Sequence, residues 1–88
     1  MPLLSTFYGI KIRIFTETDG KHHAPHIHAI YGDNEAVFDL QGNLMKGSLP
    51  YKQLHMVQGW MAIHEDEIFD AWKAAVEGRP INKIEPLR

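Results

Sequence analysis

The N-terminal part of the chain alternates between hydrophobic and polar positions, a pattern that is typical of a half-buried β-strand. In Phe7–Thr16 (FYGIKIRIFT), isoleucines at every second position alternate with Lys11 and Arg13. Side chains two residues apart in a strand share a face, so Lys11 and Arg13 should point away from the core. The polar stretch Glu17–Pro25 that follows predicts a long hairpin loop.

Further segments with the same alternation predict an antiparallel sheet. The second strand is predicted at His26–Tyr31, the third at Glu35–Leu40 and a short fourth at Leu44–Lys46. Turn-forming residues separate them at Gly32–Asn34 and Gln41–Asn43. We therefore expect a meander of three to four antiparallel strands.

After Gly47 the hydrophobic period changes from 2 to about 3.6, which indicates helices. Ser48 is the expected N-cap, and Pro50 fits the first helical turn. A break is expected near His64, because the acidic run Glu65–Glu67 suits the N-terminus of a second helix.

Each predicted helix has an apolar stripe that should face the sheet. The first stripe consists of Leu54, Val57, Trp60, Met61 and Ile63, and the second of Ile68, Phe69, Trp72, Ala75 and Val76. Gly78 and Pro80 should end the second helix. Both tryptophans lie on these stripes, so we expect them in the core rather than at a surface that binds bases.

This order of elements predicts an α+β fold in a single domain spanning residues 1–88. The strands should lie within residues 7–46 and two C-terminal helices within residues 49–77, with an extended tail at residues 79–88 along the surface. Because both helices pack on one face of the sheet, the opposite face should stay uncovered and carry Lys11 and Arg13. We expect a partner to bind there.

Composition and charge narrow the possible environments. Of the 88 residues, 44% are hydrophobic and 23% charged, which supports neither disorder nor a fibrous protein. The absence of cysteine excludes disulfides, thiolate zinc sites and cysteine nucleophiles, and it favours a reducing compartment. A net charge of −2 argues against a general nucleic-acid coat protein. No apolar run is long enough to span a membrane, and we expect a cytoplasmic protein.

Four of the six histidines lie within the segment HHAPHIHA. His26 and His28 share a face of their predicted strand, so both imidazoles could bind one metal ion or one phosphate. Such a pair suits zinc, nickel or manganese, with a third ligand from His64, Glu35 or Asp39. In the alternative interpretation, the imidazoles pair with cross-strand neighbours and satisfy backbone groups, without any metal.

Another chemical hypothesis needs no metal. RNA cleavage requires a general acid, a general base and cationic stabilisation of the transition state. His26 and His28 could supply the acid and the base. If the first two strands are neighbours, Lys11, Arg13 and Tyr8 could supply the stabilisation. The sequence has no nucleophile elbow around a serine and no glycine-rich phosphate loop, which argues against serine catalysis and nucleotide hydrolysis.

Six motifs follow one another along nearly the whole chain: FYGIKIRI, APHIHAIYG, EAVFDLQGNL, GSLP, WMAIHEDEIFDAW and KIEPLR. In this order and spacing they resemble a small bacterial family known as domain of unknown function 4160. The resemblance implies one component of a two-gene module of the proposed toxin–antitoxin kind, with a small cognate protein encoded beside it. It also implies that His26, His28 and His64 are motif residues, together with Tyr31 and Gly32.

The leading hypothesis is therefore a partner-binding protein, the toxin or its counterpart, that uses its uncovered sheet face or its tail. If the tail is the binding element, deleting Ile81–Arg88 should weaken partner capture and leave the fold intact. One alternative is a His-dependent ribonuclease or metal-dependent hydrolase centred on His26 and His28. The other is a metal-binding module without catalysis.

Overall fold

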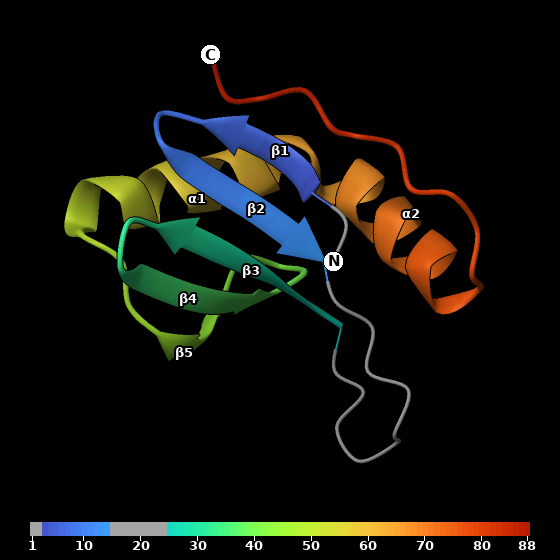
Figure 1. The fold of residues 1–88 in the computed structure, drawn as a ribbon, viewed down its shortest axis with the longest axis horizontal. Helices are drawn as coiled ribbons and strands as arrows, with labels where there is room; N and C mark the ends of the chain where they lie inside the picture. Colours follow the sequence, from blue (N-terminus) through green and yellow to red (C-terminus); the bar gives the residue numbers. More distant parts are fainter. Residues whose placement is uncertain (1–2, 15–24) are drawn as a thin grey trace.

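The computed structural model describes residues 3–14 and 25–88, which form one sheet and two helices (Figure 1). In chain order the elements are β1 (Leu3–Phe7), β2 (Ile10–Ile14), β3 (His26–Tyr31), β4 (Asn34–Asp39), β5 (Leu44–Gly47), α1 (Tyr51–Ile63) and α2 (Glu65–Val76). The strands lie side by side in the order β1-β2-β3-β4-β5, and each is antiparallel to its neighbour. This confirms the predicted α+β fold, a meander followed by two C-terminal helices, with one strand more than expected.

The additional strand is β1, which precedes a tight turn at the start of the predicted strand Phe7–Thr16. Tyr8 and Gly9 have φ angles of 49° and 81°, as in the two-residue type I′ turns that connect hairpin strands. They join β1 to β2, and Phe7 pairs with Ile10 across the turn. The sheet therefore begins before the predicted range 7–46. The predicted long loop after β2 falls outside the described residues except for its last residue, as do two of the histidines in HHAPHIHA.

One face of the sheet forms the hydrophobic core with the helices, which lie behind the sheet in Figure 1. The alternation in β2 is confirmed, since Ile10, Ile12 and Ile14 are all fully buried. The core also contains Leu4, Phe7, Ile27, Ala29, Ala36, Phe38, Leu40, Val57, Trp60, Met61 and Ile68. Burial of each large apolar side chain contributes about 1.5–3 kcal/mol, so this face is the main source of stability.

The turn between β4 and β5 is held by the carboxylate of Asp39. Its Oδ1 accepts hydrogen bonds from the backbone N–H groups of Gln41 and Asn43, both at 2.9 Å, and its Oδ2 accepts one from the Asn43 side chain at 3.0 Å. Burial raises the pKa of Asp39, but these hydrogen bonds to the ionised form outweigh it and hold the pKa below its ordinary value. Ionised Asp39 therefore stabilises the fold.

We expect the stability of the protein to depend on this ionisation. Because the pKa is lower in the folded state, the contribution is present above about pH 4 and is lost as the pH falls through the folded pKa. Asp39→Asn should lower the free energy of unfolding by about 1 kcal/mol near neutral pH and by less in acid. Urea unfolding at neutral and acidic pH measures this. Asp33→Asn, in an exposed turn, is the control, and the same pH dependence in Asp39→Asn and wild type would contradict the expectation.

The start of α1 differs from its prediction, whereas the break between α1 and α2 agrees with it. α1 starts after Pro50 without a side-chain cap, so the predicted N-cap Ser48 was wrong. The backbone N–H of Ser48 instead donates to the Glu35 carbonyl at 3.1 Å, which extends the contact of β5 with β4. The predicted break at His64 is confirmed, and three acidic residues occupy the first turn of α2. No helix of the described residues is both long and apolar enough to cross a membrane.

α2 buries a different face than its largest apolar residues predict. The stripe of α1 is largely confirmed, because its buried residues are Val57, Trp60 and Met61. In α2, however, the buried residues are Ile68, Ala71 and Ala74, whereas Phe69 and Val76 are more than half exposed. Ala71 and Ala74 line a pocket together with Arg79, Pro80 and Ile84, so the face of α2 that carries these alanines lies beside the returning tail.

The C-terminal tail is extended, as predicted, and it also completes the core. Ile84 is 5% exposed, and its N–H donates to the Leu4 carbonyl in β1 at 2.8 Å. The indole N–H of Trp60, a fully buried residue of α1, donates to the Glu85 carbonyl at 2.7 Å. Figure 1 shows the tail returning from α2 past β1. Deletion of the tail should therefore reduce stability, contrary to the expectation drawn from the sequence.

Candidate functional site

The sheet face opposite the helices brings together the cationic and imidazole side chains singled out by the sequence. The strand pairing places Arg13 of β2 opposite His28 of β3, and it extends this row to Val37 of β4 and Lys46 of β5. Lys11 lies on the same face, two residues along β2 from Arg13. No helix or strand of residues 3–14 and 25–88 covers this face in Figure 1. We call it the open face and define it by Lys11, Arg13, His26, His28, Ile30, Glu35, Val37 and Lys46.

Two imidazoles and a carboxylate form the chemical centre of the open face. The ring centroids of His26 and His28 are 5.2 Å apart. His28 Nδ1 lies 2.7 Å from Glu35 Oε2. Because the Glu35 side chain is 52% exposed, solvent weakens this pair, and it contributes at most about 1 kcal/mol to stability. Its greater effect is on orientation, because the carboxylate at Nδ1 fixes the direction of the imidazole ring.

The register of the β3–β4 hairpin explains why Glu35 reaches His28. A two-residue turn begins at Gly32, which has a φ of 58° and follows Tyr31, the residue that pairs with Asn34. Glu35 is therefore a diagonal neighbour of His28, within reach of a long side chain. The sequence suggested Glu35 only as a third metal ligand and did not reveal this hydrogen bond. A two-residue turn with glycine first was the signal that fixes the register.

Asp39 is the residue opposite His26 in the sheet, but it serves another purpose. Both of its carboxylate oxygens accept hydrogen bonds from the β4–β5 turn. It therefore acts in the turn, and Glu35 is the carboxylate that contacts the imidazole pair.

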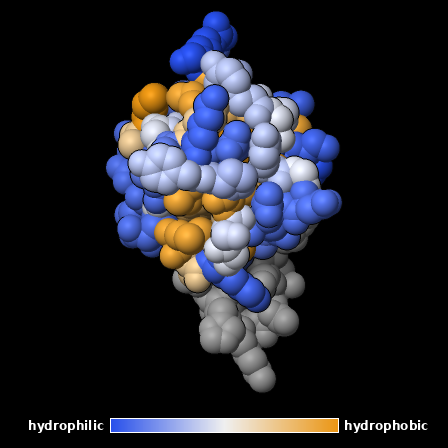
Figure 2. All heavy atoms as spheres, turned by 90° about the vertical axis from the view of Figure 1, so that its left-hand side faces the viewer, coloured by the Kyte–Doolittle hydropathy of each residue, from blue (hydrophilic) through white to orange (hydrophobic). Residues whose placement is uncertain are grey.

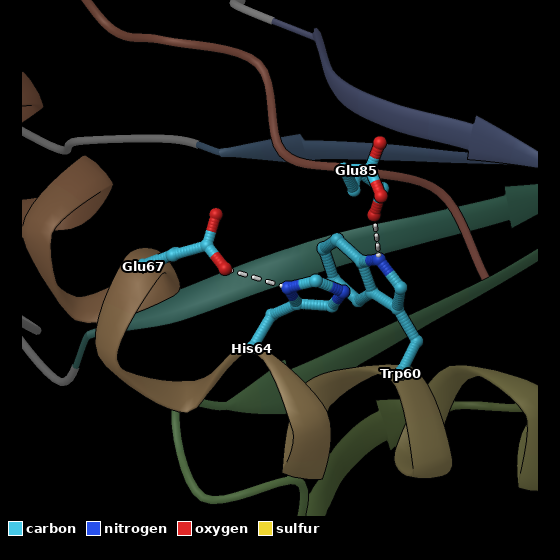
Figure 3. A network of polar contacts seen from close by, with 4 residues as sticks. All are labelled: Trp60, His64, Glu67 and Glu85. Atoms are coloured by element: carbon cyan, nitrogen blue, oxygen red, sulfur yellow. Dashed lines mark hydrogen bonds and ion pairs between the residues drawn. The ribbon is translucent and has the colours of Figure 1, made fainter.

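His64 lies at the junction of α1 and α2, on the side of the sheet that the helices cover. Its Nδ1 is 2.7 Å from Glu67 Oε1, and its ring centroid is 5.7 Å from that of Trp60. Figure 3 shows these three side chains together with Glu85 of the tail, whose carbonyl accepts the Trp60 hydrogen bond. These contacts connect the helix junction to the tail. Their role is to stabilise the fold.

The structure therefore does not bring His64 to His26 and His28, the set suggested for a metal. Among residues 3–14 and 25–88, no group of three histidine, aspartate or glutamate side chains could hold a metal ion. Binding of zinc, nickel or manganese by the His26–His28 pair stays a prediction.

Tyr8, suggested as a contributor to RNA cleavage, lies apart from the imidazoles. It is 61% exposed in the turn between β1 and β2, at the opposite end of β2 from Arg13. Figure 2 views the end of the molecule where this turn and the start of α1 lie, and hydrophobic residues reach the surface there between hydrophilic ones. Large exposed apolar residues of the described chain include Tyr8, Leu44, Met45 and Tyr51. Tyr8 therefore belongs to the turn and not to the histidine site.

Comparison with protein families places this geometry in context. The model of the family described as domain of unknown function (DUF4160) matches residues 9–73, well over half of the chain. The chain belongs to the DUF4160 family. This confirms the resemblance that the sequence motifs indicated. No curated protein and no solved structure matches the chain.

The DUF4160 match contains every residue that defines the open face. It runs from the β1–β2 turn into α2, and it leaves β1 and the tail outside. These two outer segments contact each other through Leu4 and Ile84. The family description assigns no activity, so the functional argument for this DUF4160 protein depends on the chemistry of the open face.

Proposed function

We propose that this DUF4160 protein is a partner-binding component of a two-gene toxin–antitoxin-like module in the cytoplasm, and that its open face binds the cognate protein. One observation carries the proposal. The helices cover one face of the sheet, while the other face presents polar side chains that include Arg13, His28 and Lys46. A sheet face with this composition is suited to contact a partner rather than to form core.

The charges of the open face favour an acidic partner segment. Lys11, Arg13 and Lys46 are cationic, whereas Glu35 is hydrogen-bonded to His28 and Asp39 to the β4–β5 turn. The whole chain has a net charge of −2, so positive charge is concentrated locally here. Complementary charge accelerates association and fixes the orientation of partners.

The tail is the weaker candidate for the binding element. Ile84 is buried against the core, and the backbone of the tail bonds to both β1 and α1. A partner that captured the tail would first have to break these contacts. The open face needs no such rearrangement of the helices or the tail.

Charge reversal at one position tests the surface. Lys11→Glu should weaken binding of the protein encoded beside this one by roughly tenfold or more, because it opposes an acidic segment. Isothermal titration calorimetry at low and physiological salt measures the affinity, which should fall as salt rises.

Lys52→Glu is the matched control, since Lys52 is exposed on α1, on the helical side of the molecule. It makes the same change in net charge and should leave the affinity nearly unchanged. Equal losses in both variants, or none in Lys11→Glu, would rule out the open face as the binding surface.

A further inference from the structure

We propose that His26 and His28 form a metal-independent acid–base pair that cleaves RNA, with Glu35 as the positioning residue of His28. The proposal places chemistry on the same open face as the proposed function, but it does not depend on a partner. It goes beyond partner binding by naming a reaction and a substrate class.

The short distance between the two imidazoles is the first observation that supports the proposal. Their centroids are 5.2 Å apart on one face of β3, close enough for a single phosphate group to contact both rings. A general acid and a general base must both lie within hydrogen-bond reach of the reacting oxygens. Two histidines on the same strand face place both groups on one side of the sheet, beside a common phosphate.

The hydrogen bond between Glu35 and His28 is the second observation that supports the proposal. With Nδ1 of His28 at 2.7 Å from Glu35 Oε2, the ring is held in one orientation and one tautomer. An oriented imidazole loses less freedom when it meets the substrate, which is the effect of the third group in nucleophile–base–orienter arrangements. Glu35 acts only through His28 and is not a catalytic residue.

The cationic side chains beside the two imidazoles are the third observation that supports the proposal. Arg13 is directly opposite His28 in the register, and Lys11 lies on the same face. The planar guanidinium group binds phosphate oxygens through two parallel hydrogen bonds. Positive charge at this position stabilises the additional negative charge of a pentacoordinate phosphorus transition state.

The side chains around the pair point to a substrate that brings its own nucleophile. The chain has no cysteine. The row across the sheet that contains Arg13 and His28 continues with Leu3, Val37 and Lys46 and has no serine or threonine, and the hydroxyl of Thr6 lies in the neighbouring row, opposite Lys11. RNA carries a 2′-hydroxyl group beside each phosphodiester, so attack by the substrate itself fits this site.

In the proposed step, one imidazole accepts the proton of the 2′-hydroxyl while the 2′-oxygen forms a bond to phosphorus. The bond between phosphorus and the 5′-oxygen breaks, and the other imidazole donates its proton to that leaving oxygen. The products are a 2′,3′-cyclic phosphate and a free 5′-hydroxyl. No metal, water or redox partner enters this step, and the two imidazoles have exchanged protonation states at its end.

Cleavage of a labelled single-stranded RNA oligonucleotide in the presence of EDTA tests the proposal. The intact protein should produce fragments with a 2′,3′-cyclic phosphate, and the all-deoxy oligonucleotide should stay uncut. His26→Ala and His28→Ala should each lower the rate by roughly 100-fold or more. The control His55→Ala, an exposed position on α1, should cleave like wild type, and circular dichroism checks that all variants are folded.

The positioning role of Glu35 needs a separate readout. Glu35→Gln should lower kcat by roughly tenfold or more and leave KM nearly unchanged, since the orientation of the His28 imidazole matters most in the transition state. Glu35→Asp should restore part of the loss. A loss of melting temperature with equal changes in kcat and KM would instead show a merely structural role.

Three results would overturn the proposal: RNA left uncut by the intact protein, equal cleavage by the His26→Ala, His28→Ala double variant, or loss of cleavage on adding EDTA. Affinity of the double variant for the cognate protein is measured in the absence of RNA. Partner binding and RNA cleavage can therefore fail independently of each other.

Discussion

Replacing Gly47 with alanine is expected to lower the melting temperature by roughly 10–20 °C, which corresponds to about 2–3 kcal/mol in a domain of this size. Gly47 ends β5 with a φ of 79°, a conformation that residues with a Cβ atom rarely adopt. A Cβ atom there would overlap the carbonyl oxygen of Glu35 and lie 3.2 Å from the Cα atom of Ala36. Both contacts are with the backbone of β4, so only a shift of a strand can relieve them.

Gly59→Ala is the matched control for this substitution. Gly59 lies in the middle of α1, its φ is not positive, and a Cβ atom there would meet nothing within 4 Å. Alanine should therefore stabilise the helix by about 0.5–1 kcal/mol. Thermal unfolding followed by circular dichroism measures both variants. If Gly47→Ala melts within a few degrees of wild type, the close approach of β5 to Glu35 is not a constraint on the fold.

Ile84→Ala is expected to destabilise the protein by about 2–4 kcal/mol, although Ile84 lies in a segment without helix or strand. Its side chain is 5% exposed and belongs to the same cluster as the sheet and helix residues. The substitution leaves a cavity beneath the tail and weakens the segment that accepts the Trp60 hydrogen bond through Glu85. Urea unfolding gives the change in free energy of unfolding.

Lys83→Ala tests whether the effect depends on the tail as a whole or on this one buried side chain. Lys83 is the exposed neighbour of Ile84, and its truncation should change stability by less than about 0.5 kcal/mol. Equal stability of Ile84→Ala and wild type would mean that the tail is not an integral part of the core.

The parts of the fold that the sequence predicts best are those in which local and long-range signals agree. The β3–β4 hairpin has clear alternation on both sides of a turn that begins with Gly32, so its strands were expected almost at their observed bounds. The helix break at His64 follows from the acidic residues after it, which suit a helix N-terminus.

The missed features depend on tertiary contacts. Tyr8 is an unusual residue at the first position of a type I′ turn, where asparagine, aspartate and glycine prevail, so β1 was not separated from β2. α2 has apolar residues on two adjoining faces, and the buried face is the one whose Ala71 and Ala74 lie beside the C-terminal tail. Hydrophobic periodicity alone favours the bulkier residues.

The candidate site shows the same difference between features set by the local sequence pattern and features set by tertiary contacts. Period-two alternation was enough to pair Lys11 with Arg13 on one strand face and His26 with His28 on another, but only the register of β2 and β3 shows that the two faces are the same. The hydrogen bond between His28 and Glu35 depends on the pairing register of two strands, and the separation of His64 depends on which face the helices cover. Neither is encoded in the local pattern.

The contact between Leu4 and Ile84 has a consequence for the order of folding. Each hairpin of the meander joins neighbouring segments, whereas this contact joins two residues that are 80 positions apart in the sequence. Closing a longer loop costs more chain entropy, and contacts between distant residues slow folding. The tail should therefore dock after the hairpins and helices have formed. In native-state hydrogen exchange, its amide protons should open at a lower free energy than those of β2 and β3.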